Sequence, residues 1–319
     1  MSVKLTVVIH AEEEFDWNGG FHRANTKVSH GNELIELMGE LLALDATIVL
    51  AMDYPFVMSQ DGEKVIAFCN PYAPDKIEYA AHLHPWVNPP FDDDAPSITN
   101  HDSFPGNLDK NSETQKLRVL TNAITKKTGI RPITYLAGRY GIGANTADIL
   151  KALGYKIDLS ISAYSNFSHV EGPNFAHYSN QIHAKHGLTY IPHTCAMVGF
   201  CRAMDDYLNK HPQTIAKAQQ HNSYQLLSRL FRIHKYRLSP EGFSLAEMQR
   251  LTQSQLRIGQ KAFILSFHSP SAKLGGTPYV TNKRALHAFK QGLIDYIRWF
   301  NQLENSTSFL PNQAYGGSH

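Results

Sequence analysis

Three consecutive glutamates, Glu12 to Glu14, follow the apolar segment at residues 5–9 of this 319-residue chain after only two intervening residues, His10 and Ala11. Such a run of branched apolar side chains predicts a buried strand, so the carboxylates stand at a strand end with no helical spacer before them. A buried carboxylate has to be paired, hydrogen-bonded or bound to a metal. The segment HAEEEFDW at residues 10–17 therefore favours a functional site over a solvated acidic face.

Other side chains that can do chemistry lie beside further predicted strands, namely Arg139, Asp158 and His268, and the segment AAHLHPW adds His82 and His84. The carboxyl ends of parallel strands meet at one edge of a sheet, so we expect these residues to share one site. His82 and His84 are two positions apart, which places both on the same face of an extended strand. Carboxylates and imidazoles suit a divalent first-row metal, and three protein ligands leave room for a water molecule.

Each of these signals has a simpler explanation when it is taken alone. The two histidines of the HLHPW segment can simply pack against Trp86. Arg139 can bind an anion at a helix N-terminus or lie on the surface, and His268 can be an ordinary core or surface histidine. The glutamates after the first strand are what favours a shared metal site.

Alternating strand and helix patterns predict the framework of this site. Apolar, β-branched runs predict strands at 5–9, 47–52, 133–137, 157–161, 189–191 and 263–267. Amphipathic patterns predict helices at 31–45, 111–129, 143–155, 244–260 and 282–303, the second with a capping box from Ser112 to Gln115. This alternation predicts an α/β fold with a mostly parallel sheet, closed as a barrel or open and doubly wound. No glycine-rich phosphate loop follows the first strand, which argues against a nucleotide site there.

Composition narrows the class of protein further. The chain is 42% hydrophobic and 18% charged, with a net charge of +2, and no basic stripe or acidic tail predicts a nucleic-acid or membrane partner. No segment has the length of a membrane span and the N-terminus does not resemble a signal peptide, so we expect a cytoplasmic protein. The three cysteines match no zinc or disulfide spacing, and we expect them to be reduced and buried.

The chain is predicted to form one domain over residues 1–305, followed by a frayed tail at 306–319. Two long polar segments, 88–106 and 163–180, are rich in proline, glycine and serine. Connections of this length inside a domain are more often functional than simple turns. We therefore expect them to cover the substrate.

Taken in order along the chain, these motifs resemble the polysaccharide deacetylase family, carbohydrate esterase family 4 with its NodB homology. HAEEEFDW and HLHPW are similar to the first two motifs of its WalW-like subgroup. RYG at Arg139 and LSFH at His268 are similar to two later motifs of the family. The resemblance extends from Leu5 to about Ser271. It implies a distorted (β/α) barrel with seven strands and metal-dependent hydrolysis of an N-acetyl or O-acetyl group.

The resemblance also assigns roles to individual residues. It implies that Glu12 is the catalytic base and that one divalent metal ion is bound by Glu13, His82 and His84. Zinc is the expected metal, with cobalt, manganese or nickel as alternatives. His84 replaces an imidazole that the family usually places four residues after the first, where this chain has Trp86. Arg139 would hold the base, Asp158 would anchor Arg139, and His268 would be the general acid.

The substrate is expected to be a saccharide or another small molecule, with Trp17, Trp86 and Tyr140 placed to stack on a sugar ring. The family usually has aspartates at the positions of Glu12 and Glu13. The subgroup usually has an aspartate at the position of His10. These departures leave three hypotheses open. In the first, the protein removes an acyl group, with acetyl expected, from an amino sugar or saccharide intermediate. In the second, it hydrolyses a non-sugar C–N bond on the same fold. In the third, it is an inactive carbohydrate-binding or scaffold protein. The oligomeric state is not predicted.

Overall fold

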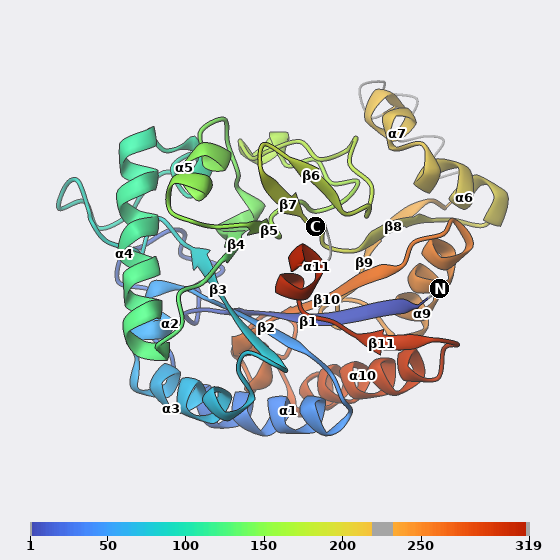
Figure 1. Ribbon diagram of the computed structural model, residues 1–319, viewed down its shortest axis with the longest axis horizontal. Helices are drawn as coiled ribbons and strands as arrows, with labels where there is room; N and C mark the ends of the chain where they lie inside the picture. The colour runs from blue at the N-terminus through green and yellow to red at the C-terminus, as the bar shows by residue number, and fades with distance from the viewer. Residues whose placement is uncertain (1, 219–231, 317–319) are drawn as a thin grey trace.

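The computed structural model describes residues 2–218 and 232–316, which form one large curled sheet with helices outside it and a small second sheet (Figure 1). The strands are β1 (Val3–Ala11), β2 (Ile48–Met52), β3 (Ile77–Leu83), β4 (Thr134–Ala137), β5 (Ile157–Asp158), β6 (His183–Lys185), β7 (Leu188–Tyr190), β8 (Cys195–Val198), β9 (His234–Arg237), β10 (Ala262–His268) and β11 (Ser306–Ser308). The α-helices are α1 (Gly31–Ala43), α2 (Tyr54–Met58), α3 (Gln60–Cys69), α4 (Lys110–Thr128), α5 (Thr146–Ala152), α6 (Arg202–Lys210), α7 (Pro212–Ala218), α9 (Leu245–Arg257), α10 (Lys283–Asn301) and α11 (Pro311–Gly316).

The main sheet has the strand order β10-β1-β2-β3-β4-β5-β7-β6, and β11 pairs with β1 as its ninth strand. All pairings from β10 to β7 are parallel, whereas β6 joins β7 in an antiparallel pair. Strands β8 and β9 form a separate antiparallel pair. The described strands make a half-barrel that curls without closing, so the expected barrel architecture is only partly present and its strand count of seven is not confirmed.

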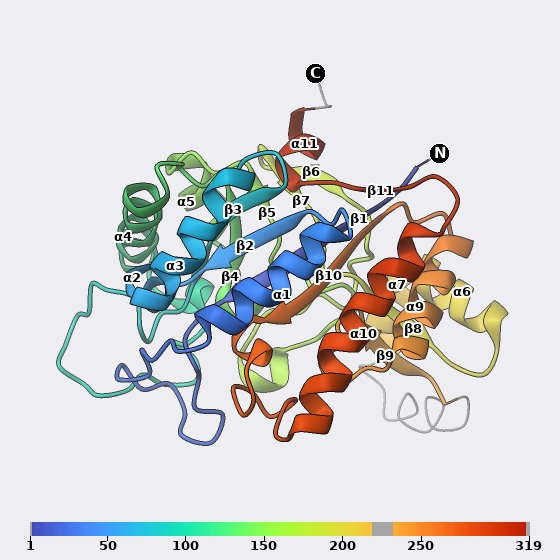
Figure 2. The same cartoon turned by 90° about the horizontal axis from the view of Figure 1, so that it is seen from below.

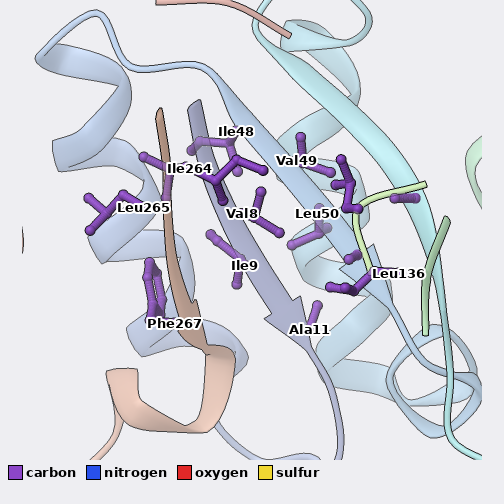
Figure 3. Close-up of a cluster of buried hydrophobic side chains, with 14 of the residues drawn as sticks. Val8, Ile9, Ala11, Ile48, Val49, Leu50, Leu136, Ile264, Leu265 and Phe267 are labelled. Atoms are coloured by element: carbon purple, nitrogen blue, oxygen red, sulfur yellow. The ribbon is translucent and has the colours of Figure 1, made fainter. Parts of the chain in front are cut away.

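The core lies on both faces of the central strands. Leu50 in β2 and Leu265 in β10 are fully buried, as is Val8 between them in β1 (Figure 3). Parallel strands covered on both faces carry nearly continuous apolar sequence, and each such side chain contributes about 2 kcal/mol by leaving water. Helices α1 and α10 cover the outer face of this part of the sheet, with α3 beside α1 (Figure 2).

Strand register brings the polar strand ends together. His10 at the end of β1 is paired with His268 at the end of β10, and His82 near the end of β3 with Leu136 in β4. The long segments 88–106 and 163–180 lie at the same edge of the sheet, and both supply side chains to the cavity described below. The parallel topology therefore brings these strand ends to one edge of the sheet.

Four local expectations are wrong. Strand β3 was not among the predicted strands, although it carries His82. Helix α4 is capped by Asp109, which accepts hydrogen bonds from the helix backbone, and not by Ser112. The expected frayed tail is ordered over residues 306–316, because Phe309 and Leu310 are buried where β11 extends the sheet; residues 317–319 lie outside the described part. Cys201 is exposed, unlike the other two cysteines.

Candidate functional site

A compact set of three donor atoms lies at the ends of β1 and β3. The Nε2 atoms of His82 and His84 are 3.0 Å apart. Oε2 of Glu12 is 3.4 Å from the first of these nitrogens and 3.6 Å from the second. All three side chains are buried. One carboxylate and two imidazoles in this spacing form a group that can hold a metal ion.

The other nitrogen of each imidazole is already occupied. Nδ1 of His82 donates to the backbone carbonyl of Leu136 at 2.9 Å, and Nδ1 of His84 donates to Oε2 of Glu13 at 2.9 Å. Burial, followed by the charge of His84, lowers the pKa of His82, so its ring is neutral. The two Nε2 atoms lie within hydrogen-bond distance of each other, and with each Nδ1 engaged elsewhere both can turn a lone pair toward one cation, as metal-binding histidines do.

Glu13 supports this set from the side remote from the cavity. Its Oε1 accepts a hydrogen bond from the Trp86 indole at 2.8 Å, and its backbone N–H donates to Asp53 at 3.1 Å. Trp86 also stacks on the His84 ring, with 4.3 Å between ring centroids. Burial raises the pKa of Glu13 to about 7. Glu13, Asp53 and His84 form a second group with metal-binding spacing, but Glu13 does not line the cavity.

Glu14 has a third environment. It accepts hydrogen bonds from the backbone and hydroxyl of Ser29 and forms an ion pair with Lys27 at 2.8 Å. Partial burial acts in the opposite direction, but hydrogen bonds from His30, Lys27 and Ser29 hold the pKa of Glu14 well below its usual range. Glu14 therefore fixes the loop after β1 and is remote from the cavity.

His268 closes the site from the neighbouring strand β10. Its Nδ1 is 2.7 Å from Oε2 of Glu241, whose Oε1 accepts from the His268 backbone and the Ser271 hydroxyl. This leaves Nε2 of His268 for the cavity. Burial lowers the pKa of His268, but the charges of Glu241 and Glu12 outweigh burial and raise it to about 9. The ring is therefore charged near neutral pH and close to Glu12.

Arg139 and Asp158 do not form the expected relay to Glu12. Within residues 2–218 and 232–316, Arg139 donates to Asn100 at 3.0 Å and to the Ser103 hydroxyl, and its guanidinium lies 3.9 Å from the Phe104 ring centroid. Asp158 accepts from the backbone of Ser160, and burial raises its pKa to about 6. The Arg139 backbone is left-handed, at φ 54°, and the side chain binds the segment 88–106.

A cavity of about 390 Å³ lies above the three donor atoms. Among the predicted site residues, its lining includes Glu12, Trp17, His82, His84, Trp86, Arg139, Tyr140 and His268. Trp17 is 44% exposed and can contact a ligand with its ring, whereas Trp86 and Tyr140 are buried and help shape the wall. Phe104 and Phe167 complete the aromatic lining from the two long polar segments.

Sequence reasoning gave no role to several residues at the site. His10 lines the cavity, and its ring centroid is 4.8 Å from that of His268. His193 is buried, donates from Nδ1 to Leu159, and has no hydrogen-bond partner for Nε2 among the described residues. The position of His193 just after the predicted strand 189–191 could have indicated it. Arg237 and Glu241 follow a segment without any strand or motif signal and could not have been found in that way.

Comparison with known proteins shows the fold. A scan of known protein families and a search of curated proteins both find no match. A proposed polysaccharide deacetylase from Mycobacterium smegmatis superposes with a TM-score of 0.52 at 13% identity, covering 99% of this chain and 90% of that one. The allantoinase PuuE superposes with a TM-score of 0.50 at 13% identity, covering 98% of this chain and 89% of the allantoinase chain. The 4-alpha-glucanotransferase from Thermococcus litoralis gives a TM-score of 0.54 at 8% identity, with this chain spanning 41% of its length.

These likenesses show an α/β fold shared with a proposed polysaccharide deacetylase, an allantoinase and a 4-alpha-glucanotransferase, and they do not single out the WalW-like subgroup. Among the helices in the described ranges, none is both long and apolar enough to cross a membrane.

Proposed function

We propose that this protein is a metal-dependent hydrolase that removes an acyl group from an amino sugar or saccharide intermediate. An acetyl group is the expected acyl group. The observation that carries the proposal is the convergence of Glu12, His82 and His84, with the second nitrogen of each imidazole committed elsewhere. Ligand sets held by such outer hydrogen bonds are typical of metal centres. When bound there, a divalent cation such as zinc would polarise the acyl carbonyl and activate water.

The geometry favours a different division of labour from the one that the sequence resemblance implied. Glu12 directs Oε2 at both imidazoles, so we assign it as the carboxylate ligand. Burial acts to raise the pKa of Glu12, but the charge of His268 and the contact with His82 outweigh burial and lower this pKa. Glu12 is therefore ionised and can also accept a proton. Glu13 orients His84 in place of binding the metal directly.

His268 supplies the second proton transfer. The ring is charged, Nδ1 is fixed by Glu241, and Nε2 is left to donate to the departing nitrogen or oxygen. Trp17 and the aromatic wall of the cavity suit the apolar face of a sugar ring. Arg139 is a substrate-binding candidate in this proposal, since it lines the cavity and makes no contact with Glu12.

Metal content of the purified protein tests this proposal. We expect about one divalent ion per chain in the wild type, loss of that ion in His82→Ala, and full retention in His287→Ala, which changes an exposed histidine on α10. A wild-type protein that holds no metal even after reconstitution would contradict the proposal and favour a carbohydrate-binding role. Activity on small amides, with none on acetylated sugars, would keep the metal site but select the C–N hydrolase alternative.

A further inference from the structure

A second cavity, of about 340 Å³, adjoins the first. The two share Phe167, Arg237 and Tyr279 in their linings, so these three side chains stand between them. The side cavity also borders Glu241, the residue that holds His268. The side cavity therefore lies next to the reaction centre, and a substituent of a ligand in the first cavity has only these shared side chains to pass to reach it.

Two cations from one strand line this side cavity. Lys235 and Arg237 are two positions apart in β9, so their side chains project from the same face of that strand. The β8 partner places Cys195 opposite Arg237, and Cys195 lines the cavity as well. The cations are therefore held by a paired strand and not by a loose loop.

Both cations have neutral partners. Arg237 donates to the Tyr140 hydroxyl at 3.2 Å, and Lys235 donates to the Ser165 hydroxyl at 2.7 Å. Over residues 2–218 and 232–316, neither forms an ion pair with a carboxylate. Glu241 is the acidic residue in the lining, but both of its oxygens are bound by donors from His268 and Ser271.

The positive charge that faces the cavity is thus not neutralised by hydrogen-bonded ion pairs within the described chain. A guanidinium beside an ammonium group in a shared concave site attracts anions, and a guanidinium matches carboxylate and phosphate groups in geometry. Hydroxyl groups of Ser162 and Tyr279 line the same cavity and can add hydrogen bonds to such a group. An uncharged sugar substituent would leave both cations without an anionic hydrogen-bond partner.

We propose that the side cavity is an anion-binding subsite and that the substrate is an acylated compound bearing a carboxylate or phosphate group. The role of this group as part of the substrate rests on the proposed hydrolase function. The binding of an anion by Lys235 and Arg237 does not.

Calorimetric titration of the full chain with inorganic phosphate, and separately with acetate, tests the subsite. Protein stripped of metal with a chelator and kept at low ionic strength avoids binding of these anions to the catalytic metal. We expect one site, weakened about tenfold or more by Arg237→Gln, because each lost charge-assisted hydrogen bond is of that order. Lys235→Gln changes an exposed residue, so it tests the same site if Arg237→Gln fails to fold. Lys283→Gln, an exposed lysine on α10, is the matched control and should bind as the wild type does.

The His82→Ala variant separates the two proposals. Phosphate or acetate binding that persists in His82→Ala and is lost in Arg237→Gln supports the subsite, whether or not the protein hydrolyses anything. Binding that is absent from stripped wild type, or that is unchanged by both β9 substitutions, overturns it and leaves the metal-site proposal intact. Tighter binding of phosphate than of acetate indicates a phosphorylated substrate, and the reverse order a carboxylated one.

Discussion

Replacing Glu13 by glutamine tests whether this residue orients a ligand or is itself a ligand. The Glu13 carboxylate accepts two hydrogen bonds in the structure, one from Nδ1 of His84 at 2.9 Å and one from the Trp86 indole at 2.8 Å. A glutamine side chain has one acceptor oxygen and one donor group. Because the indole can only donate, satisfying Trp86 turns the amide N–H₂ toward His84.

The imidazole of His84 must then accept at Nδ1 and carry its proton on Nε2, the atom that faces Glu12 and His82. A protonated Nε2 cannot bind a metal. If the amide turns the other way, His84 keeps its tautomer but the buried indole meets a second donor. Loss of such an outer hydrogen bond lowers metal affinity by about 10- to 100-fold, which is much less than the loss of a direct ligand. We expect Glu13→Gln to fall in this range.

Competition against a chelator of known affinity measures this effect, with Trp86→Phe as the comparison. That variant keeps an aromatic ring on His84 and leaves both Glu13 oxygens free to accept from the imidazole, so its metal affinity should fall less than that of Glu13→Gln. Metal affinity in Glu13→Gln equal to the wild type would refute the orienting role. Complete loss, as expected for His82→Ala, would instead identify Glu13 as a direct ligand.

Two further predictions concern other carboxylates. Glu241→Gln keeps a hydrogen-bond acceptor beside His268 but removes the negative charge that keeps the His268 ring charged. We therefore expect kcat to fall by about tenfold or more while metal content stays unchanged. An unaltered kcat in steady-state assays would show that Glu241 does not support His268 as the general acid. Burial raises the pKa of Glu78 to about 7, above the value of 4.5 for an unperturbed glutamate, even though Thr134 and Asn312 donate to it. Its contribution to stability is therefore full below about pH 4.5 and is lost, by about 3 kcal/mol, as the pH rises through about 7. Urea unfolding at about pH 5 and about pH 8 should show a smaller loss in Glu78→Gln than in the wild type, and an equal loss would show that other groups control it.

The parts of the fold that the sequence predicted are those where one local signal dominates. Strand β1 and helix α10 have long, regular apolar patterns, and both lie where expected. Strand β3 was missed because its sequence, IEYAAHL, contains a glutamate, two alanines and a histidine, all of which become buried through contacts remote in the chain. Strand β11 was missed for a similar reason, since Ser306–Ser308 has little apolar content and is held by parallel pairing with β1.

Prediction of the site had the same limit. Convergence of strand ends follows from parallel topology alone, and it brought Glu12, His82 and His268 together as expected. The partner of each side chain depends on exact positions in space, which spacing along the chain does not determine. Arg139 accordingly binds Asn100 and not Glu12, and Glu241 reaches His268 from a segment with no recognisable motif.

The three adjacent glutamates show why residue type at a strand end is informative while residue role is not. Glu12 faces His82, His84 and the cavity and is ionised; Glu13, one residue later, is buried against Trp86 with a raised pKa. Glu14 meets Lys27 in the loop beyond. Carboxylates are tolerated in this run because each has a different set of donors, so their mutual repulsion is offset separately at each position. Inserting or deleting one residue at the end of β1, before Glu12, would exchange these environments, and for that reason the assignment of the metal ligand depends on the path of the backbone after β1.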